Sequence, residues 1–168
     1  MLSHLITSKT RLRLLVKFFM HAANEGYLRG LATEMNESTN AIRKELNHLS
    51  EAGLIVRRED EQRITYQANP SHPFFELIQQ MVRKYLGLDT IVEQVLHRLG
   101  DVRRVILVGD YAQGIDSGSI EVVVEGEVLN VDYITQLAHK ISQEIQKQVH
   151  IVPVQQFEGV GVVIFEQE

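Results

Sequence analysis

The stretch from Ser38 to Ile55 reads STNAIRKELNHLSEAGLI and decides the fold of the first half of the chain. Its apolar residues recur at the spacing of a helix that buries one face, namely Ile42, Leu46 and Leu49, joined by Ala52. Ser38 or Thr39 can cap this helix, because a hydroxyl oxygen accepts hydrogen bonds from the free amides of the first turn. Gly53 follows the last apolar turn, where a left-handed residue commonly ends a helix.

Two helices are predicted before this one and a hairpin after it. The apolar spacing indicates two helices, at Lys9–Ala23 and Tyr27–Met35. In the first, the apolar residues are Leu12, Leu15, Val16, Phe19 and Met20, and the other faces carry Arg11, Arg13 and Lys17. Short apolar runs on either side of the polar turn Glu59–Gln62 predict paired strands, at Leu54–Arg58 and Arg63–Gln67. This order of elements is that of a winged helix-turn-helix. After the hairpin, a further amphipathic helix is predicted at Phe74–Leu86.

Beyond Gly87 strands alternate with helices, which indicates a small α/β unit. The expected elements are a helix at Thr90–Leu99, a strand at Arg104–Val108, a glycine-rich loop at Gly109–Gly118, a strand at Ile120–Val124, a helix at Val131–Lys147 capped by Asn130, and strands at Val149–Val154 and Val160–Phe165. We therefore expect an α+β protein with one domain at residues 1–88 and another at residues 89–168.

Composition limits the classes of function. The chain has 168 residues, no cysteine and a formal net charge of −5, so it holds no disulfide, thiolate metal site or cysteine nucleophile. Residues 1–88 carry 12 lysines and arginines against 9 acidic residues, whereas residues 89–168 carry 5 against 13. A basic half on an acidic protein fits a module that binds a polyanion. Arg13 and Lys17 interrupt the longest apolar run, so we expect a cytoplasmic protein without a membrane partner.

The predicted polar faces carry residue types that bind DNA. With the apolar stripe buried, the helix after Ser38 turns Asn40, Arg43, Lys44 and Asn47 to the opposite side. Arginine and asparagine can read base edges, while lysine and the capping hydroxyls of Ser38 and Thr39 suit phosphates. The candidate contacts in the hairpin are Arg57, Arg58 and Arg63.

The segment from Leu28 to Gln67 resembles the winged helix-turn-helix of ArsR-like bacterial transcription regulators. The matching residues are Leu31-Ala32, Ser38-Thr39, Leu46, Leu49, Ala52-Gly53-Leu54-Ile55 and Tyr66. The resemblance implies sequence-specific binding of double-stranded DNA as a homodimer, with the first helix and the Phe74–Leu86 helix as candidate dimer surfaces. Many such proteins sense metals, but this chain lacks cysteine and never places two histidines three or four positions apart. We expect no metal and no cofactor.

From Val105 to Phe157 the chain resembles small nucleotidyltransferase domains, on the run Val108–Gly114 followed by Ser119-Ile120-Glu121. Such domains need carboxylates that converge on Mg²⁺. The resemblance places Asp110, Ser119, Glu121 and His150 at the motif positions, so the motif is degenerate and we expect no enzyme activity. The retained scaffold is a candidate effector-binding or architectural module, and its candidate effector contacts are Gly109, Asp110, Tyr111, Gly114, Ser119 and Glu121.

The leading hypothesis is therefore a dimeric DNA-binding transcriptional regulator whose second domain binds a small-molecule effector or is architectural. One alternative is a divergent Mg²⁺-dependent nucleotidyltransferase that rebuilds its metal site around Glu121. Another is a protein-interaction scaffold that does not bind DNA, because winged helices also serve as dimerisation modules.

Overall fold

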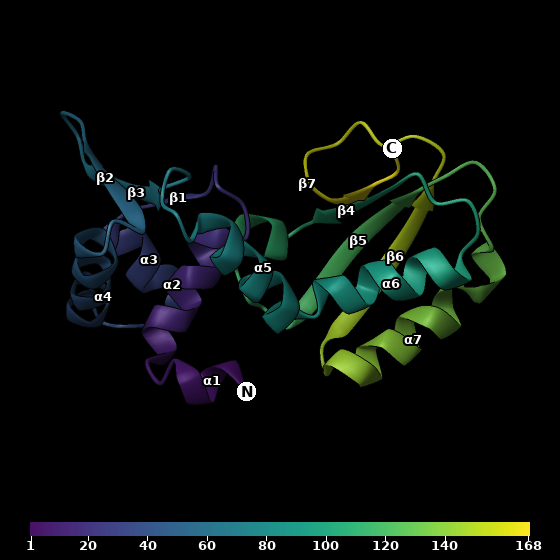
Figure 1. Ribbon diagram of the computed structural model, residues 1–168, viewed down its shortest axis with the longest axis horizontal. Helices are drawn as coiled ribbons and strands as arrows, with labels where there is room; N and C mark the ends of the chain where they lie inside the picture. Colours follow the sequence, from purple (N-terminus) through teal and green to yellow (C-terminus); the bar gives the residue numbers. More distant parts are fainter. The chain divides into compact units, whose positions relative to one another are not determined.

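The computed structural model describes all 168 residues, which divide into two compact units. Residues 1–82 and 113–115 form the N-terminal unit, and residues 83–112 and 116–168 form the C-terminal unit. The division falls inside α5 (Phe75–Leu86), a few residues before the boundary that the sequence predicts near residue 88. The fold class is α+β, as predicted (Figure 1).

The N-terminal unit is a helix-turn-helix followed by a hairpin. Its helices are α1 (Leu2–Leu5), α2 (Lys9–Phe19), α3 (Leu28–Met35) and α4 (Thr39–Glu51), followed by the first part of α5. Its strands are β1 (Glu25–Gly26), β2 (Ile55–Glu59) and β3 (Ile64–Ala68), which form an antiparallel sheet in the order β1-β3-β2. The predicted winged order is confirmed. The sequence missed β1, because two residues are too few to show an alternating pattern.

Helix α2 forms the centre of the N-terminal core. It buries the predicted apolar residues Leu12, Leu15, Val16 and Phe19, and it also buries Leu14 and Phe18 completely. The helix ends at Phe19, earlier than the predicted Ala23. The prediction of a polar face at Lys17 was wrong, because only 8% of this residue is exposed.

Polar side chains of α2 hold the helix-turn-helix in place. Three ion pairs run from α2 to α3, the following turn and α4: Lys17 Nζ to Glu34 Oε1 at 2.8 Å, Arg13 Nη1 to Glu37 Oε1 at 2.7 Å, and Arg11 Nε to Glu45 Oε2 at 2.8 Å. Glu45 is only 6% exposed, and Ser8 Oγ also donates a hydrogen bond of 3.0 Å to its carboxylate. Burial alone would raise the pKa of Glu45, but the hydrogen bonds from Arg11 and Ser8 and the charge of Arg11 outweigh it and lower the pKa.

The C-terminal unit is a four-stranded sheet with helices on one face. Its elements are α6 (Leu88–Arg98), β4 (Arg104–Val108), β5 (Ser119–Glu125), α7 (Ile134–Ile145), β6 (Gln148–Val154) and β7 (Val162–Glu166). The strand order is β6-β5-β4-β7, with β5 and β6 parallel and the other pairs antiparallel. Helices α6 and α7 lie on the same side of the sheet (Figure 1). The alternating residues Ile120, Val122 and Val124 of β5 are fully buried.

Helix α7 departs from the prediction at both ends. It begins at Ile134, after a 3₁₀ turn at Val131–Tyr133, and the side chain of Asn130 makes no capping hydrogen bond. It ends at Ile145, because Gln146 takes a left-handed conformation with φ of 57°. The other predicted strands and helices of this unit are confirmed within about three residues at their ends. No helix of the protein has the length and apolar composition needed to cross a membrane.

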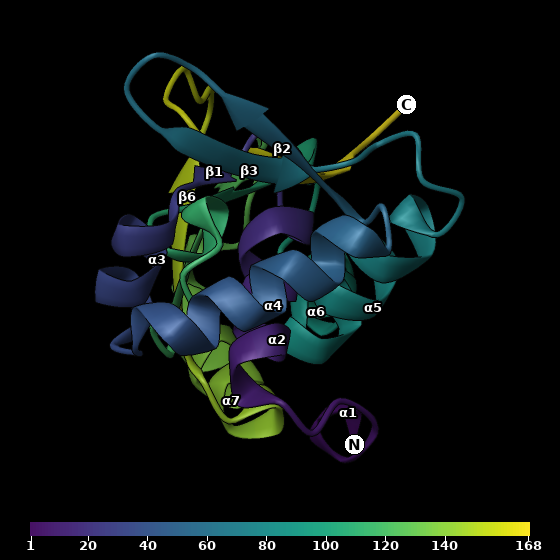
Figure 2. The ribbon, with the colours of Figure 1, turned by 90° about the vertical axis from the view of Figure 1, so that its left-hand side faces the viewer.

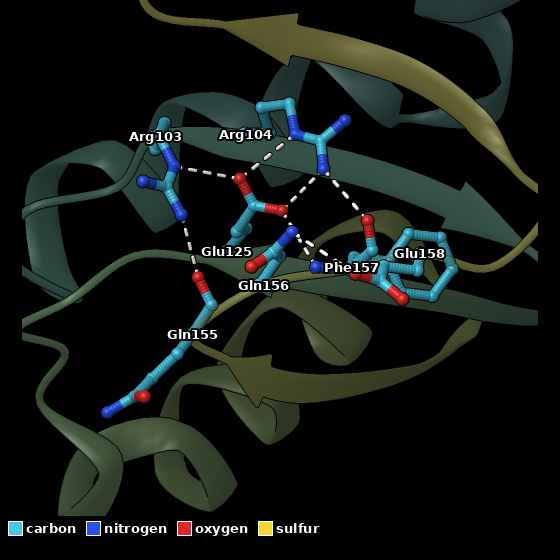
Figure 3. Close-up of polar contacts among 7 residues, drawn as sticks. All are labelled: Arg103, Arg104, Glu125, Gln155, Gln156, Phe157 and Glu158. Atoms are coloured by element: carbon cyan, nitrogen blue, oxygen red, sulfur yellow. Dashed lines mark hydrogen bonds and ion pairs between the residues drawn. The ribbon is translucent and has the colours of Figure 1, made fainter.

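A buried carboxylate ties the end of the C-terminal sheet to the loop between β6 and β7 (Figure 3). Glu125 is 3% exposed and accepts hydrogen bonds from Arg104, from Arg103 Nε at 2.8 Å and from the backbone amide of Phe157 at 2.9 Å. The same arginines donate to the carbonyls of Gln155 and Phe157 at 2.7 and 3.1 Å. The hydrogen bond from Arg104 is the main cause that lowers the pKa of Glu125 to about 2, against the opposing effect of burial.

We predict that Glu125→Gln removes an acid-sensitive contribution to stability. The folded-state pKa of about 2 lies below the ordinary value of 4.5, so the ionised Glu125 stabilises the fold at neutral pH and loses this effect as the pH falls from 4.5 towards 2. At pH 7 the variant should lower the free energy of unfolding by about 1–3 kcal/mol, measured by urea denaturation.

The matched control is Glu127→Gln, which changes an exposed glutamate two positions away. The difference between wild type and Glu125→Gln should shrink as the pH approaches 3, while the control follows wild type. Equal stability of the two variants at pH 7 would contradict the role assigned to Glu125.

Candidate DNA interface

Helix α4 presents the predicted polar face to solvent. The cap is Ser38, whose Oγ accepts a hydrogen bond of 3.2 Å from the amide of Ala41. Three residues of the predicted apolar stripe are buried, with Ile42 at 0%, Leu46 at 1% and Leu49 at 4% exposure. The prediction was wrong for Ala52, which follows the last residue of α4 and is exposed. The predicted DNA contacts of this helix are all exposed: Ser38, Thr39, Asn40, Arg43, Lys44 and Asn47. Figure 2 shows α4 across the front of the N-terminal unit, with the β2–β3 hairpin beside it.

The cations on the outer face of α4 lack carboxylate partners. Arg43 Nη1 donates a hydrogen bond of 3.2 Å to Asn40 Oδ1, one turn earlier. Lys44 has no ion pair within the chain. By contrast, Arg11, Arg13 and Lys17 of α2 form ion pairs, and their partners are Glu45, Glu37 and Glu34. The outer face of α4 therefore offers unpaired positive charge and amide groups to a ligand.

The hairpin sends its first two arginines in opposite directions. Arg57 pairs in register with Tyr66 and Arg58 with Thr65, and successive residues of a strand point to opposite faces of the sheet. All three predicted arginines of the hairpin are exposed: Arg57, Arg58 and Arg63. A ligand that approaches the hairpin from one side therefore contacts either Arg57 or Arg58, and not both.

The turn of the hairpin is acidic. Glu59, Asp60 and Glu61 are consecutive and exposed. The amides of Arg63 and Gln62 donate to Asp60 Oδ1 at 2.9 and 2.8 Å, and these bonds lower the pKa of Asp60. The turn is therefore negatively charged at neutral pH. The sequence analysis named only the arginines of the hairpin and missed this acidic turn.

Tyr27 is a neighbour of this surface that the sequence analysis missed. Arg63 lies over the ring of Tyr27, with its Cζ 4.7 Å from the ring centroid, and Tyr27 is 40% exposed. Tyr27 precedes α3 and Arg63 precedes β3, so they are far apart in sequence. No pattern along the chain marks this pair, because it arises from the pairing of β1 with β3.

In the C-terminal unit, part of the predicted effector site gathers at one end of the sheet. Val108, Glu121 and His150 lie side by side on β4, β5 and β6. Gly109 follows Val108 with φ of 70°, and a Cβ there would lie 2.7 Å from Glu121 Oε2. Asp110 and Glu121 are exposed. The structure thus brings Gly109, Glu121 and His150 together at this end of the sheet.

Two other predicted effector residues are engaged elsewhere. Tyr111 is fully buried, and its hydroxyl donates to Asp116 and accepts from the amide of Gly118 at 2.9 Å. Burial and the bond to Asp116 raise the pKa of Tyr111. Gly114 groups with the N-terminal unit, where a Cβ would lie 2.6 Å from Lys17 Cα. Both residues therefore have structural contacts that leave their side-chain positions closed to a ligand.

The remaining predicted effector residue, Ser119, borders a polar hollow of about 560 Å³. The lining residues are Ser117, Gly118, Ser119, Ser142, Gln146, Lys147 and Gln148. This lining contains one cation and no carboxylate. Nowhere in the structure do three or more histidine, aspartate or glutamate side chains form a group that could hold a metal ion.

No family model matches this sequence, and no curated protein is significantly similar to it. Among solved structures, the chain is similar to reduced HlyU from Vibrio cholerae N16961, with 22% sequence identity and a TM-score of 0.40. The similarity covers 52% of this chain and 83% of HlyU.

We predict that Ser38→Ala destabilises the N-terminal unit and that Thr39→Ala does not. Ser38 satisfies the amide of Ala41, whereas Thr39 is the first residue of α4 and caps no amide. Loss of a serine cap costs about 0.5–2 kcal/mol, which urea denaturation resolves. A larger effect at Thr39 than at Ser38 would show that the cap is misassigned.

Proposed function

We propose that this protein is a sequence-specific DNA-binding transcriptional regulator that acts as a dimer. The observation that carries the proposal is the outer face of α4, where Asn40, Arg43, Lys44 and Asn47 are exposed without a carboxylate partner. A helix of this kind fits the major groove, where arginine binds guanine and asparagine binds adenine in bidentate fashion. The hairpin supplies further cations for the adjacent backbone.

The proposed dimer surface is the exposed side of α5 and the residue before it. Phe74 and Leu77 are each 60% exposed and lie three positions apart. The alternative surface, α2, has already buried its apolar residues within the N-terminal core. A two-fold dimer would place its recognition helices about 34 Å apart, one turn of DNA, and would read a palindromic site.

We propose that the C-terminal unit is a degenerate nucleotidyltransferase-like scaffold that binds an effector or is architectural. The row of Gly109, Glu121 and His150 supports the alignment with nucleotidyltransferases. His150 supplies no carboxylate at that row, and Ser119 is a hydroxyl where such enzymes carry an aspartate. Mg²⁺-dependent transfer of labelled nucleotide that is lost in Glu121→Gln would instead establish the enzyme alternative.

We predict that Arg43→Ala and Lys44→Ala weaken DNA binding in different ways. The protein is first used to enrich fragments from a genomic pool, and the variants are titrated on the enriched sequence. If Arg43 reads a base, Arg43→Ala should lose about 1–3 kcal/mol of binding free energy and relax specificity at one position. Lys44→Ala should weaken binding to all sequences and reduce the salt slope by about 1.

The matched control is Lys140→Ala, which removes an exposed cation from α7. It should bind as wild type does. Failure to enrich any motif would instead favour a protein-interaction scaffold.

We predict that Leu77→Glu converts the dimer to a monomer, since a buried carboxylate at a two-fold interface faces its own copy. Analytical ultracentrifugation at micromolar concentration measures the change, and the control is Val128→Glu, at a residue that is 74% exposed. A wild-type protein that sediments as a monomer at these concentrations would refute the dimer.

A further inference from the structure

The acidic turn of the hairpin makes its tip unsuited to enter a DNA groove. Glu59, Asp60 and Glu61 are exposed, and backbone amides keep Asp60 ionised. None of the three has a cation closer than Arg57, whose Nη2 lies 4.0 Å from Glu59 Oε2 at the solvent surface. The minor groove has a strongly negative potential, so a tip with three carboxylates is repelled from it.

The side chain of Arg63, at the end of this turn, packs on Tyr27. The guanidinium lies over the ring of Tyr27 at 4.7 Å from Cζ to centroid, and it has no hydrogen bond or ion pair from its side chain. An arginine over an aromatic ring keeps its N–H groups at the edge of the plane, where they can bind the oxygens of a phosphate in bidentate fashion. The ring also limits the rotamers of Arg63, which lowers the entropy lost when a ligand binds.

The ring of Tyr27 is itself fixed against α3. A Cβ at Gly30 would lie 2.7 Å from Cζ of Tyr27, so the ring occupies the space that any other residue at position 30 would need. Arg63 therefore stacks on a ring whose position α3 restricts.

We infer that Arg63, positioned by Tyr27, binds a DNA phosphate beside the recognition helix, while the acidic tip of the hairpin stays out of the groove. This inference rests on the proposed DNA-binding function and names a contact outside the recognition helix. The hairpin then helps to fix the register of the protein on the duplex. Contacts to phosphates set the position of a protein on DNA, whereas contacts to bases determine which sequence it binds.

The test measures affinity and salt dependence on the fragment that wild type enriches. Arg63→Gln and Tyr27→Leu should each weaken binding by about threefold to tenfold, and Arg63→Gln should reduce the salt slope by about 1. Tyr27→Phe should retain wild-type affinity, because the ring face is kept. The double variant Glu59→Gln/Glu61→Gln should change affinity by less than about threefold, because a tip outside the groove feels only screened repulsion.

The matched control for the loss of charge is Arg98→Gln, at an exposed arginine of the C-terminal unit. Urea denaturation of Tyr27→Leu and Tyr27→Phe separates a loss of contact from a loss of folding. If wild type binds DNA and Arg63→Gln behaves like Arg98→Gln, the phosphate contact is overturned while the regulator proposal stands. A change of tenfold or more from neutralising the tip would overturn its exclusion from the groove, and a wild-type protein that enriches no DNA would overturn both proposals.

Discussion

The carboxylate of Glu45 is the constraint on which the N-terminal unit depends. It lies on the inner side of α4, almost fully buried, and an unpaired charge there would cost several kcal/mol. Ser8 and Arg11 provide the compensating hydrogen bonds from the start of α2. Because these bonds are directional, they fix the rotation of α4 about its own axis, which the apolar contacts of Ile42 and Leu46 alone determine less tightly. The rotation of α4 in turn decides which residues face solvent.

This arrangement separates the positive and negative charges of the N-terminal unit in space. Residues 28–68 contain six lysines and arginines and seven acidic residues, so their net charge gives no sign of a DNA-binding surface. Three of those carboxylates, however, are engaged by cations of α2, and three others sit together at the turn of the hairpin. The cations of α4 are left on a surface of their own. The spatial separation of charge, and not its sum, produces the candidate interface.

The sequence predicted those features that depend on local periodicity. The stripe of α4, its cap at Ser38 and the hairpin follow from apolar spacing and turn chemistry, and the structure confirms them. The ion pairs of α2 were not predictable, because Lys17 and Glu45 at helical spacing look the same as residues of a solvated face. The stack of Arg63 on Tyr27 and the burial of Tyr111 were missed for the same reason: both arise between residues whose proximity only the tertiary fold creates.

The acidity of the whole chain does not oppose the proposed interface. Residues 89–168 carry a net charge of −8, and the protein as a whole −5. At physiological ionic strength the Debye length is about 8 Å, so a phosphate at the surface of α4 interacts mainly with charges within that distance. Unpaired cations such as Arg43 and Lys44 act at contact distance, where screening is weakest. Carboxylates that lie farther than the Debye length from the bound phosphate are largely screened by salt, so the net charge of the chain does not decide whether the cations of α4 can bind DNA.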